Sequence, residues 1–298
     1  MARRLLRSMP WLKRPLVGLW GLVFGRREKL RHQVSYLSYQ STLWEWRYRA
    51  LAEEHWGPPV RPPPAPTKLP SDMLDRFTMN GRIPVREQLG DGTYPSNHPL
   101  IYTDAEIDYY ISRIKAGAPF IYLGADIWLR EAMTKYPVAG QSITVMGSIT
   151  PWYEATCLAF GARPFTIDYN PIISKSPRLE VATVAEFERN PRVFDAALSI
   201  SSFEHDGLGM YGDPIDPDGD LKTMWKMKTI VRPGGLMYFS VPMGRDALNF
   251  NVCRVYGRLR LPLMLRGWEV VDRFGFEDWH LDVDSAVEPI FVLRNAPE

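Results

Sequence analysis

The chain carries a glycine and a carboxylate at a spacing that suits a nucleotide-like cofactor. The run V-M-G-S-I-T-P-W-Y-E follows a short apolar stretch and opens a helical pattern, which places Gly147 and Ser148 in a strand-to-helix turn. Asp168 lies 21 residues after Gly147, about where an acid meets ribose hydroxyl groups in such folds. The alternative is that Asp168, followed by Tyr169 and Asn170, only caps a turn that ends the strand. Ser148 or Thr150 is expected to cap the helix, and Pro151 suits its first turn because proline has no N–H to satisfy there.

A second group of reactive side chains follows the apolar run F-D-A-A-L-S-I-S. Glu204, His205 and Asp206 come directly after this predicted strand, at the edge where a ligand would bind. The imidazole of His205 titrates near neutral pH, so it suits the removal of a proton from a substrate. We predict Glu204 and His205 as the catalytic residues. The alternative is that His205 is a hydrogen-bonded structural residue of a turn.

An acidic run comes next, formed by Asp213, Asp216, Asp218 and Asp220. Its spacing excludes an EF-hand, because Pro214 and Trp225 would occupy the first and last ligand positions of the calcium loop. We predict a Pro/Gly-rich loop in which Asp218 or Asp220 caps the helix at 221–231, and no metal site. A magnesium site that assists the acceptor is the alternative.

Alternating strands and helices must position these residues. From residue 141 onward, short apolar runs alternate with helical patterns, which predicts a doubly wound parallel sheet with helices on both faces. The closing runs W-E-V-V-D-R-F and E-P-I-F-V-L-R have no helix between them and are expected to form an antiparallel pair at one edge. Upstream, Thr103 caps a predicted helix that ends at Lys115. Ligands of such sheets lie outside the carboxyl ends of the strands.

Several of these runs resemble a known superfamily. G-A-R-P-F-T-I-D-Y-N-P, F-D-A-A-L-S-I-S-S-F-E-H and I-V-R-P-G-G-L-M-Y-F-S-V-P resemble motifs of class I S-adenosylmethionine-dependent methyltransferases, over roughly residues 141–294. More closely, G-S-x-x-P-W-Y-E and S-S-F-E-H-D-G-L-G-M-Y-G-D-P-I-D-P-D-G-D resemble an uncharacterised family of unknown function affiliated with that superfamily. The resemblance implies a Rossmann-like, mostly parallel sheet of seven strands and S-adenosylmethionine as the cofactor.

The resemblance also implies roles for particular residues. The predicted cofactor site consists of Gly147, Ser148, Asp168, Tyr169, Thr183 and Ser201. Gly147 and Ser148 would approach the methionine part of the cofactor, Asp168 would take the ribose hydroxyls, and Thr183 would lie near the adenine. The usual glycine-rich pattern is reduced here to Gly147 alone. A retained fold with an altered or empty pocket is therefore the alternative.

The predicted activity is methyl transfer to an oxygen of a small molecule or a glycan. Between the predicted fifth and sixth strands, where such folds often shape the acceptor site, lie Arg254, Tyr256, Arg258 and Arg260. They could hold an anionic substrate, such as a nucleotide sugar or a phospholipid-linked glycan, by charge-assisted hydrogen bonds. A solvated surface is the alternative. For the whole chain, the alternative is a non-catalytic binding or scaffold protein, while missing phosphate-binding glycines disfavour a nicotinamide oxidoreductase.

Charge is distributed unevenly along the sequence. Residues 1–31 hold nine Lys and Arg against one acid, which leaves 27 of the 36 basic and 33 of the 34 acidic residues for the remainder. A basic tail on an acidic body is not the footprint of a nucleic-acid-binding domain, so we predict no nucleic-acid partner. The two cysteines, Cys157 and Cys253, lie far apart in apolar stretches, which indicates a reducing compartment such as the cytoplasm.

The N-terminal part is predicted to be separate from the folded domain. Residues 1–56 form the basic and apolar tail and a helix, residues 57–70 hold seven prolines and are typical of a linker, and residues 71–298 form the methyltransferase-like domain. The apolar run of ten residues that begins at Leu16 is too short to span a bilayer, for which about 20 residues are needed. Peripheral membrane contact through residues 1–31 is one expectation; a transit peptide and a solvated tail are the alternatives.

Overall fold

A computed structural model describes residues 66, 68–87, 99–120 and 122–296 of the chain. The chain divides into two compact units, Met1–Pro59 and Val60–Glu298. The predicted tail and the helix that follows it lie outside the described residues, as does most of the proline-rich linker.

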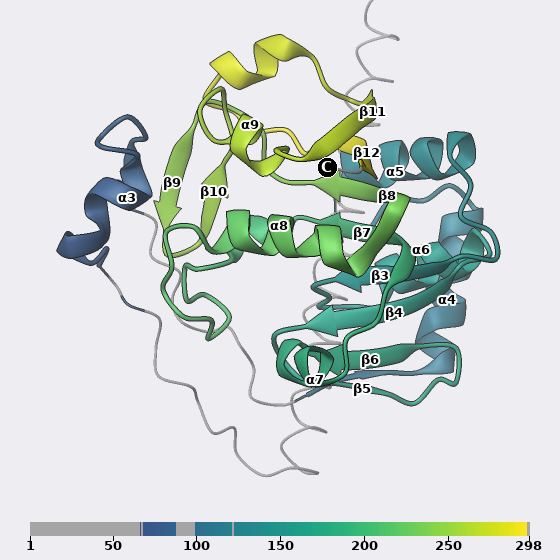
Figure 1. The fold of residues 1–298 in the computed structure, drawn as a ribbon. Coiled ribbons are helices and arrows are strands. Elements are labelled where there is room, and N and C mark those ends of the chain that lie inside the picture. Colours follow the sequence, from purple (N-terminus) through teal and green to yellow (C-terminus); the bar gives the residue numbers. More distant parts are fainter. Residues whose placement is uncertain (1–65, 67, 88–98, 121, 297–298) are drawn as a thin grey trace, which may run out of the picture. The chain divides into compact units, whose positions relative to one another are not determined.

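A seven-stranded sheet forms the centre of the described unit (Figure 1). Its strands are β3 (Ser142–Met146), β4 (Arg163–Asp168), β6 (Glu180–Thr183), β7 (Phe194–Ile200), β8 (Val231–Ser240), β11 (Trp268–Phe274) and β12 (Ile290–Asn295). They are arranged in the order β11-β12-β8-β7-β3-β4-β6, in which β12 runs antiparallel to both of its neighbours and the other neighbouring pairs are parallel. The prediction of a doubly wound, mostly parallel sheet with an antiparallel closing pair is confirmed.

The order of the strands creates a switch point beside β3. The chain runs from β3 through β4 to β6 at one edge and then returns to β7 on the other side of β3. A ligand of a doubly wound sheet binds where the order reverses in this way, outside the carboxyl ends of the strands. The ends of β3, β4 and β7 are therefore the structural frame of the predicted site.

Helices cover both faces of the sheet and pack apolar residues against it (Figure 1). They are α4 (Asp104–Lys115), α5 (Leu123–Lys135) and α6 (Trp152–Ala159) on one face, and α7 (Val184–Arg189), α8 (Gly219–Ile230) and α9 (Leu261–Met264) on the other. In α4, Ile107, Tyr110 and Ile114 recur at helical spacing and are buried, and the predicted cap is present because Thr103 Oγ1 accepts from Glu106 N (3.3 Å).

Two local predictions were wrong. Neither Ser148 nor Thr150 caps α6, whose N-cap residue is Pro151 and which has no side-chain cap. Asp218 is at the N-cap position of α8 but makes no capping hydrogen bond, and Asp220 is buried in the first turn instead. The stretch R-P-G-G follows the end of α8 at Ile230 and is part of β8, where a register shift against β7 accommodates it.

Smaller elements surround the sheet. A three-stranded sheet combines β1 (Val85–Glu87) with β9 (Ala247–Phe250) and β10 (Cys253–Val255), and a two-stranded one pairs β2 (Leu100–Tyr102) with β5 (Ile172–Ser174). Short helical segments are α3 (Leu74–Thr78) and the 3-10 turns η2 (Ser71–Met73), η3 (Phe203–His205) and η4 (Asp278–Asp282). The insertion between β8 and β11, which contains β9, β10 and α9, packs against η3 and α8.

Candidate functional site

The turns after β3 and β7 meet at the switch point. Gly147 has φ +73°, and its N–H donates to Ile167 O (2.9 Å). A Cβ atom at this position would overlap the hydroxyl group of Ser202 in the turn after β7. Two features therefore require glycine at this position: the left-handed backbone conformation and the close approach of the neighbouring turn.

Asp168 connects the ends of β4 and β3. Its Oδ2 accepts from Ser148 N (2.7 Å) and its Oδ1 accepts from Asn170 N (2.7 Å). Burial raises the pKa of the carboxyl group, although these backbone hydrogen bonds act in the opposite direction. The side chain is half-buried, and each carboxylate oxygen can accept a second hydrogen bond, so Asp168 can both shape the turn and accept from a ligand.

The other predicted cofactor residues differ in what they can offer. Ser148 is buried, and its hydroxyl donates to Thr150 O (3.0 Å). Thr183 forms a capping box with Glu186 at the start of α7, since Thr183 Oγ1 accepts from Glu186 N (3.2 Å). The Thr183 hydroxyl thus serves its own loop, and the Ser148 hydroxyl also lies 2.8 Å from Tyr102 OH of β2. Tyr169 remains 47% exposed and offers an aromatic face beside Asp168.

Ser201 and Glu204 follow β7 and contact each other directly. Ser201 has φ +50°, which is uncommon for a residue with a side chain, and its Oγ donates to Glu204 Oε1 (2.5 Å). Glu204 is 1% exposed, and burial raises its pKa to about 7. The structure therefore brings the predicted residues Ser201 and Glu204 together at the carboxyl edge of the sheet, next to Gly147.

Glu288 is a further carboxylate of this site that sequence reasoning missed. Ser201 Oγ lies 3.4 Å from Glu288 Oε1, and burial together with the charge of Glu204 raises the pKa of Glu288 to about 8. A signal was available in the sequence. An antiparallel strand begins at the edge where the parallel strands end, so a residue directly before β12 had to lie near the end of β7.

His205 is placed less favourably for a catalytic role. Its Nδ1 bonds Val252 O (2.6 Å), and because a carbonyl oxygen only accepts, this nitrogen carries the proton. The other nitrogen, Nε2, lies 3.5 Å from Glu204 Oε1. Burial lowers the pKa of His205 and thereby favours the neutral ring. The nitrogen of this ring that faces Glu204 is Nε2.

The acidic run after η3 is held by partners within the protein. Asp213 accepts hydrogen bonds from the backbone N–H groups of Gly207 (2.7 Å), Gly209 (3.1 Å) and Tyr211 (3.2 Å). Asp216 pairs with Lys222, and Asp218 pairs with Arg76. In the described part of the chain, no group of three or more His, Cys, Asp or Glu side chains is arranged to hold a metal ion. The carboxylates that a magnesium ion would need are therefore engaged in contacts within the protein, which argues against the alternative of a magnesium site.

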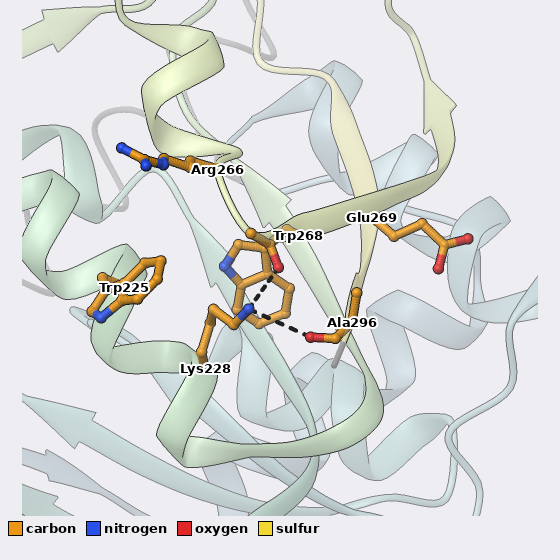
Figure 2. Close-up of a pocket in the computed structure, with 7 residues that line it drawn as sticks. Trp225, Lys228, Arg266, Trp268, Glu269 and Ala296 are labelled. Carbon is orange, nitrogen blue, oxygen red and sulfur yellow. Dashed lines mark hydrogen bonds between the residues drawn. The ribbon is translucent and has the colours of Figure 1, made fainter. Parts of the chain in front are cut away.

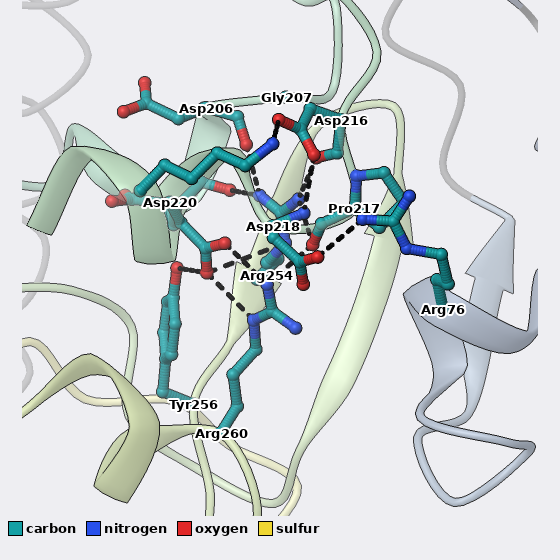
Figure 3. Close-up of polar contacts among 12 residues, drawn as sticks. Arg76, Asp206, Gly207, Asp216, Pro217, Asp218, Asp220, Arg254, Tyr256 and Arg260 are labelled. Atoms are coloured by element: carbon teal, nitrogen blue, oxygen red, sulfur yellow. Dashed lines mark hydrogen bonds and ion pairs between the residues drawn. The ribbon is translucent and has the colours of Figure 1, made fainter. Parts of the chain in front are cut away.

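Asp220 is the centre of a buried charge cluster (Figure 3). It accepts from Arg260 Nη2 (2.5 Å), Arg260 Nε (2.8 Å) and Tyr256 OH (2.8 Å), and Arg254 Nε lies 3.7 Å away. Both predictions for these arginines were wrong, because they neither face a ligand nor form a solvated surface. Only Arg258 is exposed, where it pairs with Asp282.

The same cluster fixes the loop that carries the predicted catalytic residues. Arg254 donates to backbone carbonyl groups of Asp206 (2.6 Å) and Asp216 (3.3 Å), and Arg260 Nη2 donates to Pro217 O (2.7 Å). Burial would raise the pKa of Asp220, but Arg254 and Arg260 outweigh it and hold that pKa below its usual range. The β7–α8 loop is therefore clamped onto the insertion by charge-assisted hydrogen bonds.

A pocket of about 450 Å³ lies at the end of the sheet opposite to the switch point (Figure 2). It is lined by Trp225, Lys228, Arg266, Gly267, Trp268, Glu269 and Ala296. Trp268 begins β11, and Lys228 is in the last turn of α8, just before β8 starts. Lys228 donates to Gly267 O (2.9 Å) and Ala296 O (3.4 Å), so its ammonium group is bound by backbone carbonyl oxygens. The pocket is remote from the switch point and from every predicted site residue.

The sequence matches a family of unknown function. Residues 140–287 match the model of the family described as Caenorhabditis protein of unknown function, DUF268. The resemblance to an uncharacterised family is thereby confirmed. No protein among curated sequences matches the chain.

Solved structures with similar folds include several described as methyltransferases. One is the 1,6-didemethyltoxoflavin-N1-methyltransferase of Burkholderia thailandensis with bound S-adenosylhomocysteine (16% identity, 79% of this chain and 94% of that chain, TM-score 0.42). Others are S-adenosylmethionine-dependent methyltransferases from Clostridium acetobutylicum (11%, 64% and 97%, TM-score 0.43) and Methanosarcina mazei (12%, 56% and 98%, TM-score 0.40).

Proposed function

Because residues 140–287 match a family whose function is unknown, we propose a function from the site itself: S-adenosylmethionine-dependent transfer of a methyl group to a hydroxyl group of a small molecule or a glycan. The observation that carries the proposal is the acidic character of the switch point. Asp168, Glu204 and Glu288 lie at the carboxyl edge of the sheet, and Arg254, which acts on Glu204, is committed to backbone carbonyls and Asp220. A cofactor that carries a sulfonium and an ammonium charge is complementary to these groups.

The residues present fit such a cofactor in part. Asp168 retains acceptor capacity for ribose hydroxyls, and Gly147 allows the backbone to approach closely. Ile149 (50% exposed), two residues after Gly147, and Tyr169, directly after Asp168, offer apolar surface for a purine ring. The hydroxyl groups of Ser148 and Thr183 already have partners within the protein, so we assign the binding to Gly147, Asp168, Tyr169 and the acidic edge.

The chain's own task in such a reaction is alignment and proton removal. The cofactor supplies a methyl group that is already activated by the sulfonium charge, so the protein must mainly align the acceptor with it. A hydroxyl acceptor must also lose a proton to a neighbouring group. Glu204 suits this task better than His205, whose Nδ1 is occupied by Val252 and whose Nε2 faces Glu204.

A non-catalytic binding protein is the second candidate. It is favoured by the contact between Ser202 and Gly147, which closes the turn where other members of the superfamily are expected to carry more glycines. In this case the fold would be retained without the chemistry.

Calorimetric titration of the full-length protein with S-adenosylmethionine and S-adenosylhomocysteine separates the two candidates. We expect wild type to bind both and Asp168→Ala to weaken binding at least about tenfold, which corresponds to about 1.4 kcal/mol. The matched control is Asp195→Ala. Asp195 Oδ2 accepts from Ser142 N (2.9 Å) and thus ties a backbone N–H at the other end of β3, as Asp168 does at this end.

The control decides how a loss of binding is interpreted. If the loss of affinity reflects only the weaker anchoring of β3, both variants should lose similar stability and similar affinity. If it contacts the cofactor, only Asp168→Ala should lose affinity at matched stability. Absence of binding by wild type up to millimolar concentration would reject the enzyme and leave the binding or scaffold protein.

We also propose peripheral membrane contact through residues 1–31, which lie outside the described part of the chain. The support is the sequence alone: nine basic residues surround an apolar run that contains Trp20 and Phe24. In the part of the chain that the structure describes, no helix is long and apolar enough to cross a bilayer.

A further inference from the structure

Glu204 and Glu288 form a pair of carboxyl groups connected by one hydroxyl group. Ser201 Oγ donates to Glu204 Oε1 at 2.5 Å and lies 3.4 Å from Glu288 Oε1. Glu204 belongs to η3 behind β7, and Glu288 belongs to the segment that leads into β12. Two elements that are far apart in sequence thus place their carboxylates within reach of the same hydroxyl group.

Each glutamate has one oxygen without a partner among the described residues. Glu204 Oε2 and Glu288 Oε2 are both shielded from solvent, and neither has a hydrogen-bond partner in the part of the chain that the structure describes. Glu204 is also almost completely buried as a residue. Buried polar atoms in native proteins are nearly always hydrogen-bonded, and an unsatisfied buried acceptor is costly. Two such oxygens at the carboxyl edge of the sheet therefore call for hydrogen-bond donors from a ligand.

The titratable groups around the pair do not neutralise its negative charge. The titratable groups that act on one or both carboxyls are Asp126 of α5, Tyr122 before it, Tyr153 of α6, His205 of η3, Cys253 and Arg254 of β10, and Tyr256. Tyr122 hydrogen-bonds Ser201, and Asp126 raises the pKa of Glu288. Arg254 lowers the pKa of Glu204 but is bound to carbonyl groups and Asp220.

The pair lies where methyl transfer would occur. Ser202, the next residue after Ser201, contacts Gly147 of the turn after β3, so the pair is adjacent to the switch point between β3 and β7. A donor-bearing group of the acceptor that met the cofactor there would face the two free oxygens.

We propose that Glu204 and Glu288, bridged by Ser201, bind the acceptor hydroxyl group and accept the proton that it loses, an inference that rests on the proposed function. In this step a lone pair of the acceptor oxygen forms the new O–C bond, and the electron pair of the broken C–S bond stays on sulfur, which becomes a neutral thioether. The hydroxyl proton passes to the ionised member of the pair. Glu288 thereby joins Glu204 as a catalytic residue.

The protonation of the pair sets a pH window for the test. Burial raises the pKa of Glu204 to about 7 and that of Glu288 to about 8, so the two groups lose their protons between roughly pH 6 and pH 9. A positively charged ligand group beside them should bind more tightly as the pH rises through this window. A neutral group at the same place should show little dependence.

Two probes make the test independent of the unidentified acceptor. The first is S-adenosylhomocysteine, which has no group at the position of the transferred methyl. The second is its analogue in which a carbon bearing an amino group replaces the sulfur, so that an ammonium group points toward the acceptor site. For the full-length wild type at pH 8.5, we expect calorimetry to give at least about tenfold tighter binding of the amino analogue. At pH 6 this preference should be smaller.

Conservative variants locate the effect. Glu204→Gln and Glu288→Gln should each reduce the preference for the amino analogue and its pH dependence, while affinity for S-adenosylhomocysteine stays within about twofold. Glu131→Gln, an exposed substitution on α5, is the matched control and should behave as wild type. Circular dichroism checks the fold of each variant, and the pH dependence of wild type tests the proposal even if a variant does not fold.

The outcomes separate this inference from the proposed function. If S-adenosylhomocysteine binds but the amino analogue shows no preference at any pH, the pair does not face the methyl position and the inference is wrong while the proposed function stands. If both Glu→Gln variants keep the preference for the amino analogue, the inference is also overturned, since the preference then does not come from the two carboxylates. If neither probe binds wild type, both the inference and the proposed function fail.

Discussion

The carboxyl group of Glu154 is fully buried in α6, and among the described residues only one of its oxygens has a partner. Oε1 accepts from Thr166 Oγ1 (2.7 Å), whereas Oε2 has no partner there. Burial raises the pKa of Glu154 to about 7, although its hydrogen bonds act in the opposite direction. The folded protein thus holds a proton at Glu154 that the unfolded chain releases near pH 4.5.

This pKa predicts how Glu154→Gln changes stability with pH. For a carboxyl group whose pKa is raised by folding, the stabilising contribution is complete below the unfolded pKa and is lost as the pH rises through the folded pKa. At pH 8.5, we therefore expect Glu154→Gln to be more stable than wild type by up to about 3 kcal/mol. At pH 4.5 the two should be similar. Urea unfolding followed by circular dichroism at both pH values measures the difference.

Glu131→Gln serves again as the control, because Glu131 is exposed on a neighbouring helix. Its difference from wild type should not change between the two pH values. A Glu154→Gln protein that is equally destabilised at pH 4.5 and pH 8.5 would mean that the carboxyl group matters for its shape and not for its charge.

Among the elements, α8 and the insertion after β8 are joined by the cluster around Asp220. Removing one member of a buried charge cluster leaves the others unpaired, which typically costs about 3 to 5 kcal/mol. We expect Asp220→Asn to lose about that much free energy of unfolding, because the guanidinium groups of Arg254 and Arg260 would remain buried. Thermal and urea unfolding measure the loss.

An exposed ion pair provides the comparison. Arg294 and Glu269 pair across β12 and β11 at 2.9 Å, with both side chains about half exposed. Such surface pairs contribute at most about 1 kcal/mol, so Glu269→Gln should be nearly neutral. Equal losses in the two variants would show that the Asp220 cluster is no more than another weak ion pair.

The elements also show what the sequence could predict. The seven strands and α4 were predictable because their apolar residues recur at regular spacing and because Thr103 is a recognisable cap. The helix α5 was missed, since its core face includes a buried acid, Asp126, that interrupts the apolar pattern. Asp126 is satisfied by Trp152 Nε1 (3.0 Å) and Phe120 N (2.7 Å), partners that only the fold brings together.

The candidate site was predictable only where a residue follows a strand directly. Gly147, Asp168 and Glu204 were located in this way, and the strand ends carried them to one edge. Arg254 and Arg260 were misinterpreted, because their partner Asp220 lies 34 and 40 residues earlier and its burial has no local signature. Charge alone does not distinguish a ligand-binding arginine from a buried structural one.

At the scale of the whole chain, the basic residues 1–31 and the acidic remainder are predicted to act in different places. If the tail binds an anionic surface, each basic residue near it should add up to about 1 kcal/mol, and salt should weaken the binding. We expect the full-length protein to float with anionic liposomes at low salt and much less at high salt. A version that begins at Ser71 should stay behind in both conditions. Equal behaviour of the two proteins would discard the membrane contact, and neutral liposomes control for apolar adsorption.

The position of β12 has a consequence for synthesis of the protein. This strand comes last among the described strands, yet it fills the space between β8 and β11. During translation, β8 and β11 leave the ribosome before the strand that separates them, so the nascent chain carries two unpaired strand edges that invite aggregation. Glu288 lies two residues ahead of β12 and reaches Ser201 in the same event. The carboxylate pair therefore cannot form until β12 has been synthesised, and a nascent polypeptide that stalls before β12 has an incomplete sheet and an incomplete pair.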